Sequence, residues 1–189
     1  MDVQSIRRDF EERLKMVRAD KTLSFWGKQA RIKALYEETE RQIAKLRAAH
    51  EAALQEERRE LLRRAFGAYV PSWATPSEIR QIQADYRQAL DRASQAESPA
   101  EALALLRRAD LAGDKVLARA VGFVAAERGW DSVLDAVTAQ GGVYADAVKE
   151  LRQHMAAHDT AQAKFQRRMA FAAPSRPPEL DRPVPEDAA

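Results

Sequence analysis

Residues 25–66, FWGKQARIKALYEETERQIAKLRAAHEAALQEERRELLRRAF, decide the fold class, because they contain no proline and only one glycine, Gly27. An uninterrupted helix over this stretch would be about 60 Å long, at a rise of about 1.5 Å per residue. Most helices of globular proteins have only about three to four turns. We therefore expect an all-α chain built around one long helix.

The apolar pattern of this helix is not that of a leucine zipper. With Ile32 at a heptad a position, the successive a/d pairs are Ile32/Tyr36, Thr39/Ile43, Leu46/His50 and Ala53/Glu57. The fourth pair, Ala53/Glu57, does not suit a coiled-coil core, because it lacks a large apolar side chain. The apolar residues that follow lie on a shifted face of the helix. A hairpin with the preceding helix, or packing against other subunits, explains this better than a long parallel dimer. The candidate interface residues are Ile32, Tyr36, Ile43, Leu46, Leu54 and Leu61.

Residues 2–19 supply the preceding helix. Their apolar side chains follow the i, i+3, i+4, i+7 spacing of an amphipathic helix: Val3, Ile6, Phe10, Leu14 and Val17. Residues 20–24 interrupt the pattern, and Thr22 or Ser24 can cap the next helix. Residues 1–67 are therefore predicted to form a long helical hairpin, a coiled-coil-like arm.

Residues 68–173 are predicted to form a compact bundle of short helices. Two sequences predict a helix start with a capping hydroxyl and proline at the first helical position: Thr75-Pro76-Ser77-Glu78 and Ser98-Pro99-Ala100-Glu101. Glycines then separate expected helices at about 99–112, 115–128 and 131–140. One long C-terminal helix is expected over about 143–172, from the spacing of Tyr144, Val148, Leu151, Met155, Phe165 and Met169.

Residues 174–189 contain five prolines and few apolar side chains, which predicts an extended tail. A proline-rich segment is already extended, so docking it on a subunit costs less ordering entropy than docking a flexible coil. A solvated tail without a partner is the alternative. We expect an assembly arm with Leu180 and Val184 as its apolar contacts.

The composition excludes several classes of function. The absence of cysteine excludes disulfides, thiolate metal sites and cysteine nucleophiles. No apolar run approaches the roughly 18 residues that a membrane span requires, so no membrane partner is expected. The sequence has no phosphate-binding loop, dinucleotide fingerprint or Gly-x-Ser-x-Gly elbow. We therefore expect no enzymatic activity and no cofactor.

One pattern is compatible with a metal site. His154 and His158 stand four residues apart on one helix face, with Glu150 one turn earlier. Catalytic zinc normally has three protein ligands, and Met155 follows the first histidine where a metalloprotease helix has its catalytic glutamate. A polar helix face is the better interpretation, so no metal site is predicted.

Nucleic-acid binding is the alternative to protein binding. Residues 1–66 hold 16 Lys and Arg against 12 Asp and Glu, and the pairs Arg58-Arg59 and Arg63-Arg64 can contact phosphates. Glutamates interleaved with these arginines weaken the positive electrostatic field of the helix. A nucleic-acid-binding surface usually has a denser stripe of basic residues. The favoured function is a non-enzymatic structural protein that contacts other subunits, its own copies or different proteins.

Trp73 is a further candidate for such contacts. It lies in the linker 68–74, next to Pro71, in a chain with only 7% aromatic residues. The favoured interpretation is that Trp73 fills a junction between helices, and the alternative is that it anchors an interface.

The stretch Leu23-Ser24, Gly27-Lys28, Ile32 and Leu35-Tyr36-Glu37-Glu38, followed by a charged helix, resembles the opening of a group of uncharacterised helical proteins. These belong to head and tail gene clusters of actinobacterial tailed phages and prophages. The resemblance covers about the first third of the chain and carries no catalytic motif. It implies a minor virion or head-assembly component. Independently of the resemblance, the apolar stripe from Ile32 to Leu62 is longer than residues 2–19 can cover, so we expect an oligomer or part of a larger assembly. We expect the protein in the cytoplasm before assembly and then in the virion. The composition, with 37 Ala, 23 Arg and no Asn, agrees with such a high-GC source.

Overall fold

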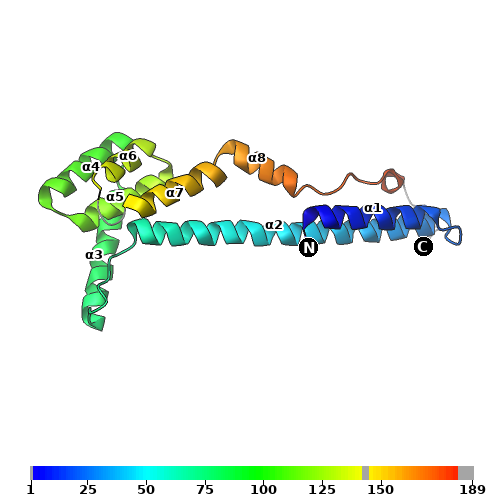
Figure 1. Ribbon diagram of the computed structural model, residues 1–189, viewed down its shortest axis with the longest axis horizontal. Helices are drawn as coiled ribbons and strands as arrows, with labels where there is room; N and C mark the ends of the chain where they lie inside the picture. The colour runs from blue at the N-terminus through cyan, green and yellow to red at the C-terminus, as the bar shows by residue number, and fades with distance from the viewer. Residues whose placement is uncertain (1, 142–144, 183–189) are drawn as a thin grey trace. The chain divides into compact units, whose positions relative to one another are not determined.

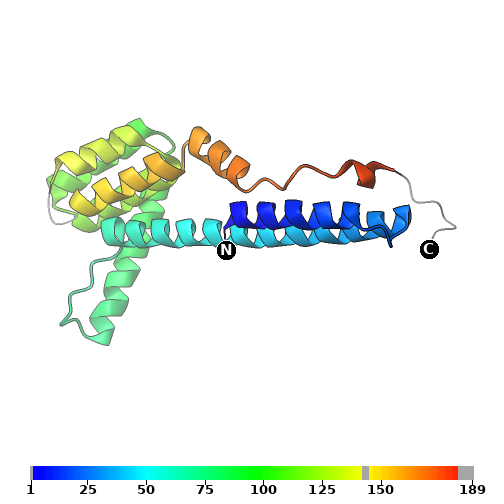
Figure 2. The ribbon, with the colours of Figure 1, turned by 45° about the vertical axis from the view of Figure 1, so that its right-hand side comes forward.

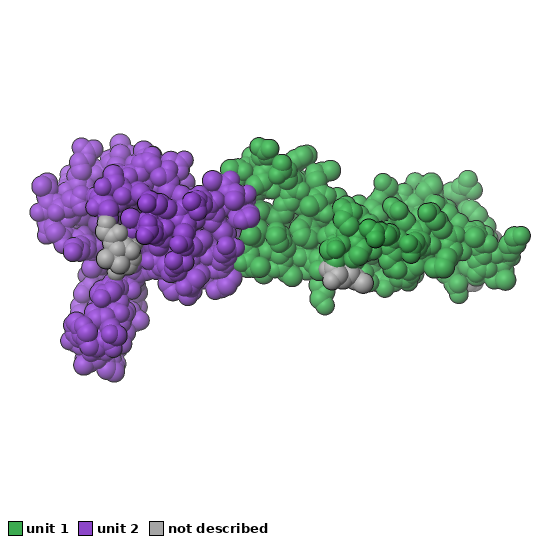
Figure 3. Space-filling model, viewed as in Figure 1, with its two compact units in different colours: residues 1–54, 160–189 green, residues 55–159 purple. Residues whose placement is uncertain are grey.

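The computed structural model describes residues 2–141 and 145–182, and it confirms the all-α fold class. The described residues form eight α-helices and one short 3-10 helix, without any strand (Figure 1). They fall into two compact units: unit 1 is residues 1–54 and 160–189, and unit 2 is residues 55–159 (Figure 3). The ranges 1–67, 68–173 and 174–189 remain a prediction about which parts fold on their own.

Unit 1 is built on two antiparallel helices, α1 (Val3–Ala19) and the part of α2 (Phe25–Phe66) that ends at Leu54 (Figures 1 and 2). We call this pair the hairpin. Asp20 makes the turn, because its Oδ1 accepts hydrogen bonds from the backbone N and the hydroxyl of Thr22, at 2.8 and 2.6 Å. Ser24 Oγ accepts from Gly27 N at 3.1 Å, which starts α2. The predicted break at residues 20–24 is confirmed.

The hairpin has its own apolar cluster. It consists of Phe10, Leu14, Ile32, Leu35 and Tyr36, all buried. The rings of Phe10 and Tyr36 meet edge to face, with centroids 6.1 Å apart, a geometry that aromatic pairs prefer. The predicted stripe of α2 therefore faces α1 at this end.

Unit 2 contains the end of α2 and five further helices: α3 (Pro76–Ser94), α4 (Pro99–Ala112), α5 (Lys115–Arg128), α6 (Asp131–Ala139) and α7 (Ala145–His158). The predicted capping hydroxyls are present, but the full capping box predicted at both sites occurs only at Thr75. Near Ser98, the Glu101 carboxylate accepts from Glu97 N at 2.8 Å instead of from Ser98 N. Thr75 Oγ1 accepts a hydrogen bond from Glu78 N at 3.4 Å, and Ser98 Oγ accepts from Glu101 N at 3.3 Å. Gly113 ends α4 with a φ of 65°, in the left-handed region that favours glycine.

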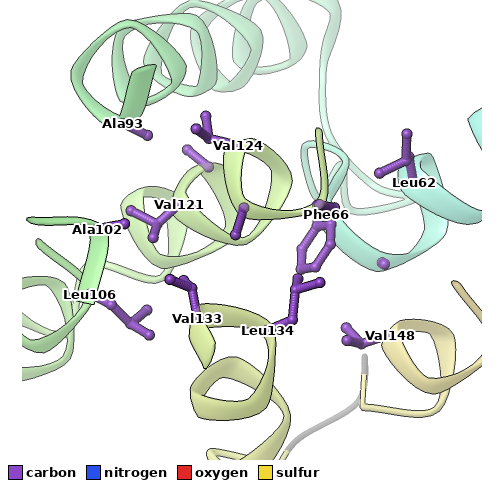
Figure 4. Packing of buried hydrophobic residues seen from close by; sticks show 14 of the residues in the cluster. Leu62, Phe66, Ala93, Ala102, Leu106, Val121, Val124, Val133, Leu134 and Val148 are labelled. Atoms are coloured by element: carbon purple, nitrogen blue, oxygen red, sulfur yellow. The ribbon is translucent and has the colours of Figure 1, made fainter. Parts of the chain in front are cut away.

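The core of unit 2 is organised around α5, which packs against α3, α4 and α6. Small side chains on α5 allow this close packing, and the most buried include Ala120, Val121, Gly122 and Ala125. Phe66, at the end of α2, inserts its ring into the same cluster (Figure 4). Only 1% of Phe66 is exposed. The end of α2 is thereby part of the core of unit 2.

The prediction of one long C-terminal helix over 143–172 is wrong. The chain has two helices here: α7 ends at His158, and α8 (Ala161–Ala170) starts anew after Thr160. Thr160 Oγ1 accepts a hydrogen bond from Ala163 N at 3.2 Å and so caps α8. This side chain competes with the backbone bonds that would continue α7.

The tail is described as far as Arg182, and it is not extended throughout as predicted, because it includes the short 3-10 helix η1 (Pro178–Asp181). Leu180 N donates to Pro177 O at 3.0 Å within this turn. Val184, a predicted contact of the tail, and Tyr144, a predicted position of the last helix, lie outside the described residues. Each helix in the described ranges is too short or too polar to cross a bilayer.

Candidate protein-interaction surface

The loop between α2 and α3, residues 67–75, exposes three large apolar side chains. We call it the aromatic loop; it is visible between α2 and α3 in Figure 2. Trp73 is 75% exposed and Tyr69 is 63% exposed, and Val70 is exposed beside them. Residues 65–77 contain no charged side chain, although 32% of the chain is charged. Trp73 therefore does not fill a helix junction in this structure.

The aromatic loop is held at both ends. At its start, Gly67 N donates to Arg63 O at 2.8 Å, and the Tyr86 hydroxyl donates to Phe66 O at 2.6 Å. In its middle, Ala74 N donates to Pro71 O at 3.1 Å and closes a turn that contains Trp73. The capping box of Thr75 fixes the exit. A loop with fixed ends presents its side chains at a smaller entropy cost than a free segment.

Tyr86 lies at the junction of this loop with the core. Burial raises the pKa of its phenol from 10.0 to about 12, because the charged form would lose hydration. The hydroxyl thus stays protonated at neutral pH and remains the donor to Phe66 O. This hydrogen bond ties α3 to the end of α2.

An open groove of about 440 Å³ begins at Gly67, next to the aromatic loop. Its apolar lining comes from α2, α3 and α5: Leu62, Tyr86, Leu90 and Phe123. Arginines of α2 form part of its edge. The groove can receive an apolar side chain of a partner that contacts the loop. No local sequence pattern predicts this groove, because its walls come from helices that are distant in sequence.

Most other predicted interface residues lie inside the chain's own packing. Ile32, Tyr36 and Ile43 are buried in unit 1, and Leu61 is buried in the cluster of unit 2. Leu46, Leu54 and Leu180 are half-buried. Among the described members of the predicted set, Trp73 is the one that is largely exposed.

The structure brings the two predicted histidines together but not their third partner. The rings of His154 and His158 lie 4.8 Å apart, and His154 Nε2 is 3.8 Å from Glu57 Oε2. The Glu150 carboxylate instead pairs with Arg64 at 2.8 Å. Across residues 2–141 and 145–182, no group of three or more His, Asp or Glu side chains could hold a metal ion.

The arginine pairs at the end of α2 are engaged with carboxylates. Arg58 contacts Glu127 at 2.9 Å and Asp159 at 3.4 Å. Arg59 and Arg63 pair with glutamates one turn before them, and Arg64 pairs with Glu150. This local neutralisation reduces the positive field that a phosphate backbone would meet.

No protein-family model, no curated protein and no solved structure matches this chain.

Proposed function

We propose that the protein is a non-enzymatic assembly component that binds other protein subunits through the aromatic loop and the neighbouring groove. The exposure of Trp73 in an uncharged, fixed loop carries this proposal. In line with the resemblance of residues 23–38, we propose that the protein belongs to the head or another structural part of a tailed phage or prophage-like particle. The coiled-coil-like arm and the proline-rich tail would supply further contacts.

The energetics favour a protein partner for this surface. A tryptophan side chain buries about 200 Å² when it is covered, which is worth up to about 5 kcal/mol at about 25 cal/mol per Å². Tryptophan and tyrosine dominate the residues whose truncation costs an interface about 2 kcal/mol or more. A loss of about 2 kcal/mol weakens binding about 30-fold. Removal of the Trp73 ring should therefore break the contact.

The test compares Trp73→Ser with Leu111→Ser in the particles of the phage or host that encodes the chain. Leu111, at the end of α4 in the same unit, is 90% exposed and serves as the matched control. Quantitative mass spectrometry of purified particles should find the Leu111→Ser chain at the wild-type level and the Trp73→Ser chain strongly depleted. Equal incorporation of both variants, or absence of the wild-type chain from particles, would refute the proposal.

The predicted phosphate contacts give nucleic-acid binding less support, because each of these four arginines has an acidic partner: Arg58, Arg59, Arg63 and Arg64. Retention of the wild-type chain on DNA, with a steep loss of binding as salt rises, would favour that alternative.

A further inference from the structure

Helix α8, orange in Figure 1, carries an exposed stripe of two cations and two large apolar side chains. Lys164 and Arg168 lie one turn apart, and Phe165 and Met169 lie one turn apart directly beside them. Phe165 is 63% exposed, Met169 is 55% exposed, and both cations are exposed as well. We call these four residues the α8 stripe. None of the residues of α8 is buried, so the described chain leaves this face of the helix uncovered.

The hairpin holds α8 by its C-terminal end and its other side. Arg7 Nη2 donates to Ala170 O at 3.2 Å, which satisfies a carbonyl group at the end of the helix. The rings of His50 and Phe171 meet just beyond this end, with centroids 5.3 Å apart. Arg167 is half-buried on the side of the helix opposite the apolar pair of the α8 stripe. The hairpin therefore fixes α8 and leaves the α8 stripe open to solvent.

The charge around the α8 stripe is positive and is not neutralised locally. Residues 160–178 contain four basic side chains and no acidic one, although the whole chain has 29 Asp and Glu. Among residues 2–141 and 145–182, no carboxylate forms an ion pair with Lys164 or Arg168. The arginine pairs near the end of α2, by contrast, have carboxylate partners. The α8 stripe is thus complementary to a negatively charged partner that also has apolar surface.

We propose that the α8 stripe binds an acidic amphipathic helix of a partner protein. Two carboxylates one turn apart on that helix meet Lys164 and Arg168, and an apolar column beside them covers Phe165 and Met169. The ring and the thioether supply apolar contact area, and the two cations fix the register and discriminate against basic partners. The α8 stripe belongs to unit 1 and the aromatic loop to unit 2, so this is a second binding surface beyond the proposed function.

Two other anionic partners fit the α8 stripe less well. A nucleic-acid backbone would pair with the cations but would leave Phe165 and Met169 uncovered, and surfaces that bind nucleic acid usually have a denser basic stripe. An anionic membrane would be held by two inserted side chains. These supply less free energy than a single myristoyl chain, which alone binds membranes only marginally. An acidic helix is the partner that covers both halves of the α8 stripe.

Fluorescence anisotropy with a labelled helical peptide tests this proposal. The peptide is an alanine helix with Glu and Leu in adjacent columns, each recurring every fourth residue, and a comparison peptide has Gln in place of Glu. The full-length wild-type chain should bind the Glu peptide at least about tenfold more tightly than the Gln peptide. Lys164→Gln combined with Arg168→Gln should abolish this preference, and Phe165→Ser should weaken the binding of both peptides. All three substituted side chains are exposed, so the variants should keep the helical circular dichroism of the wild type.

The matched control combines Arg41→Gln with Lys45→Gln. It makes the same change of net charge at two exposed residues one turn apart on α2, within unit 1, and should bind the Glu peptide as the wild type does. A wild-type chain that does not bind the Glu peptide up to the solubility limit, or binds both peptides equally, would overturn the proposal. An equal loss of binding in the control would overturn it too.

The same assay separates the other partner classes. Tighter binding of a DNA duplex, or of phosphatidylglycerol vesicles, than of the Glu peptide would assign the α8 stripe to that partner and overturn the proposal. Trp73→Ser, in the aromatic loop, should leave binding of the Glu peptide unchanged. A failure of the α8 stripe is therefore distinguishable from a failure of the proposed function.

Discussion

Gly122, in the middle of α5, offers the sharpest test of how the core of unit 2 is packed. A Cβ atom added there would lie 2.8 Å from Cδ1 of Phe66 and 3.1 Å from its Cζ, and would approach Cε1 closer still. Real Cβ atoms do not come within 3.0 Å of a neighbour, so the ring or the helix would have to shift. The Phe66 ring is enclosed by the core and has little room to move.

The change in the free energy of unfolding caused by Gly122→Ala follows from two opposing effects. Replacement of glycine by alanine inside a helix normally stabilises by about 1 kcal/mol. Overpacking of a well-filled core costs about 1–3 kcal/mol, and the upper half of that range applies because the obstacle is a buried ring. We therefore expect Gly122→Ala to lower the free energy of unfolding by about 1–2 kcal/mol. Urea unfolding followed by circular dichroism measures this loss.

Two further variants make the test specific. Gly27→Ala is the matched control, because its new Cβ would lie 3.3 Å from Ser24 Oγ and would meet no buried ring. It should leave the free energy of unfolding unchanged or raise it by up to about 1 kcal/mol. In a Phe66→Leu background, the Gly122→Ala substitution should become neutral or stabilising, since the ring edge is gone. A Gly122→Ala protein at least as stable as the wild type would show that Phe66 does not lie against α5.

Three other predictions follow from single contacts. Thr75→Ala and Ser98→Ala should each cost about 1 kcal/mol of stability in thermal unfolding, and no change would mean that these residues do not cap α3 and α4. Because the pKa of Tyr86 is raised to about 12 in the folded state, its contribution to stability is complete below pH 10 and is lost as the pH rises from 10 towards 12. The Tyr86→Phe variant should lose less of its free energy of unfolding over this range. If both proteins lose stability equally between pH 10 and 12, the phenol is not buried. Gln29→Ala should speed hydrogen exchange of the backbone amides of residues 171–182, because it removes the Nε2 group that donates to Glu179 O and Arg182 O. Unchanged exchange rates would show that other contacts hold residues 171–182 in place.

The sequence predicts most helix boundaries because the signals are local. Thr75 and Ser98 carry a glutamate three residues later, and the structure shows the expected caps. Thr160 is followed three residues later by Ala163, which cannot complete a capping box. The sequence around Thr160 therefore lacks the full signal that would predict the break between α7 and α8.

The candidate site was only partly predictable, because burial depends on contacts that are distant in sequence. Periodicity identifies Ile32 and Tyr36 as one apolar face, but whether α1 or another subunit covers that face is not a local property. Similarly, Pro71 marks a loop around Trp73, whereas the exposure of Trp73 depends on the hydrogen bonds that hold the loop ends. The groove lined by Leu90 and Phe123 has no signature in either helix alone.

The most direct measurement of the central claim is photo-crosslinking from position 72 inside purified particles. A photoreactive phenylalanine derivative replaces the exposed Ser72, next to an intact Trp73, in one chain and the exposed Leu111 in the control chain. If the aromatic loop binds a neighbouring subunit, illumination gives one defined protein adduct from position 72 and none from position 111. Absence of an adduct at position 72, or the same adduct from both positions, would contradict the claim that this loop is the protein's binding surface.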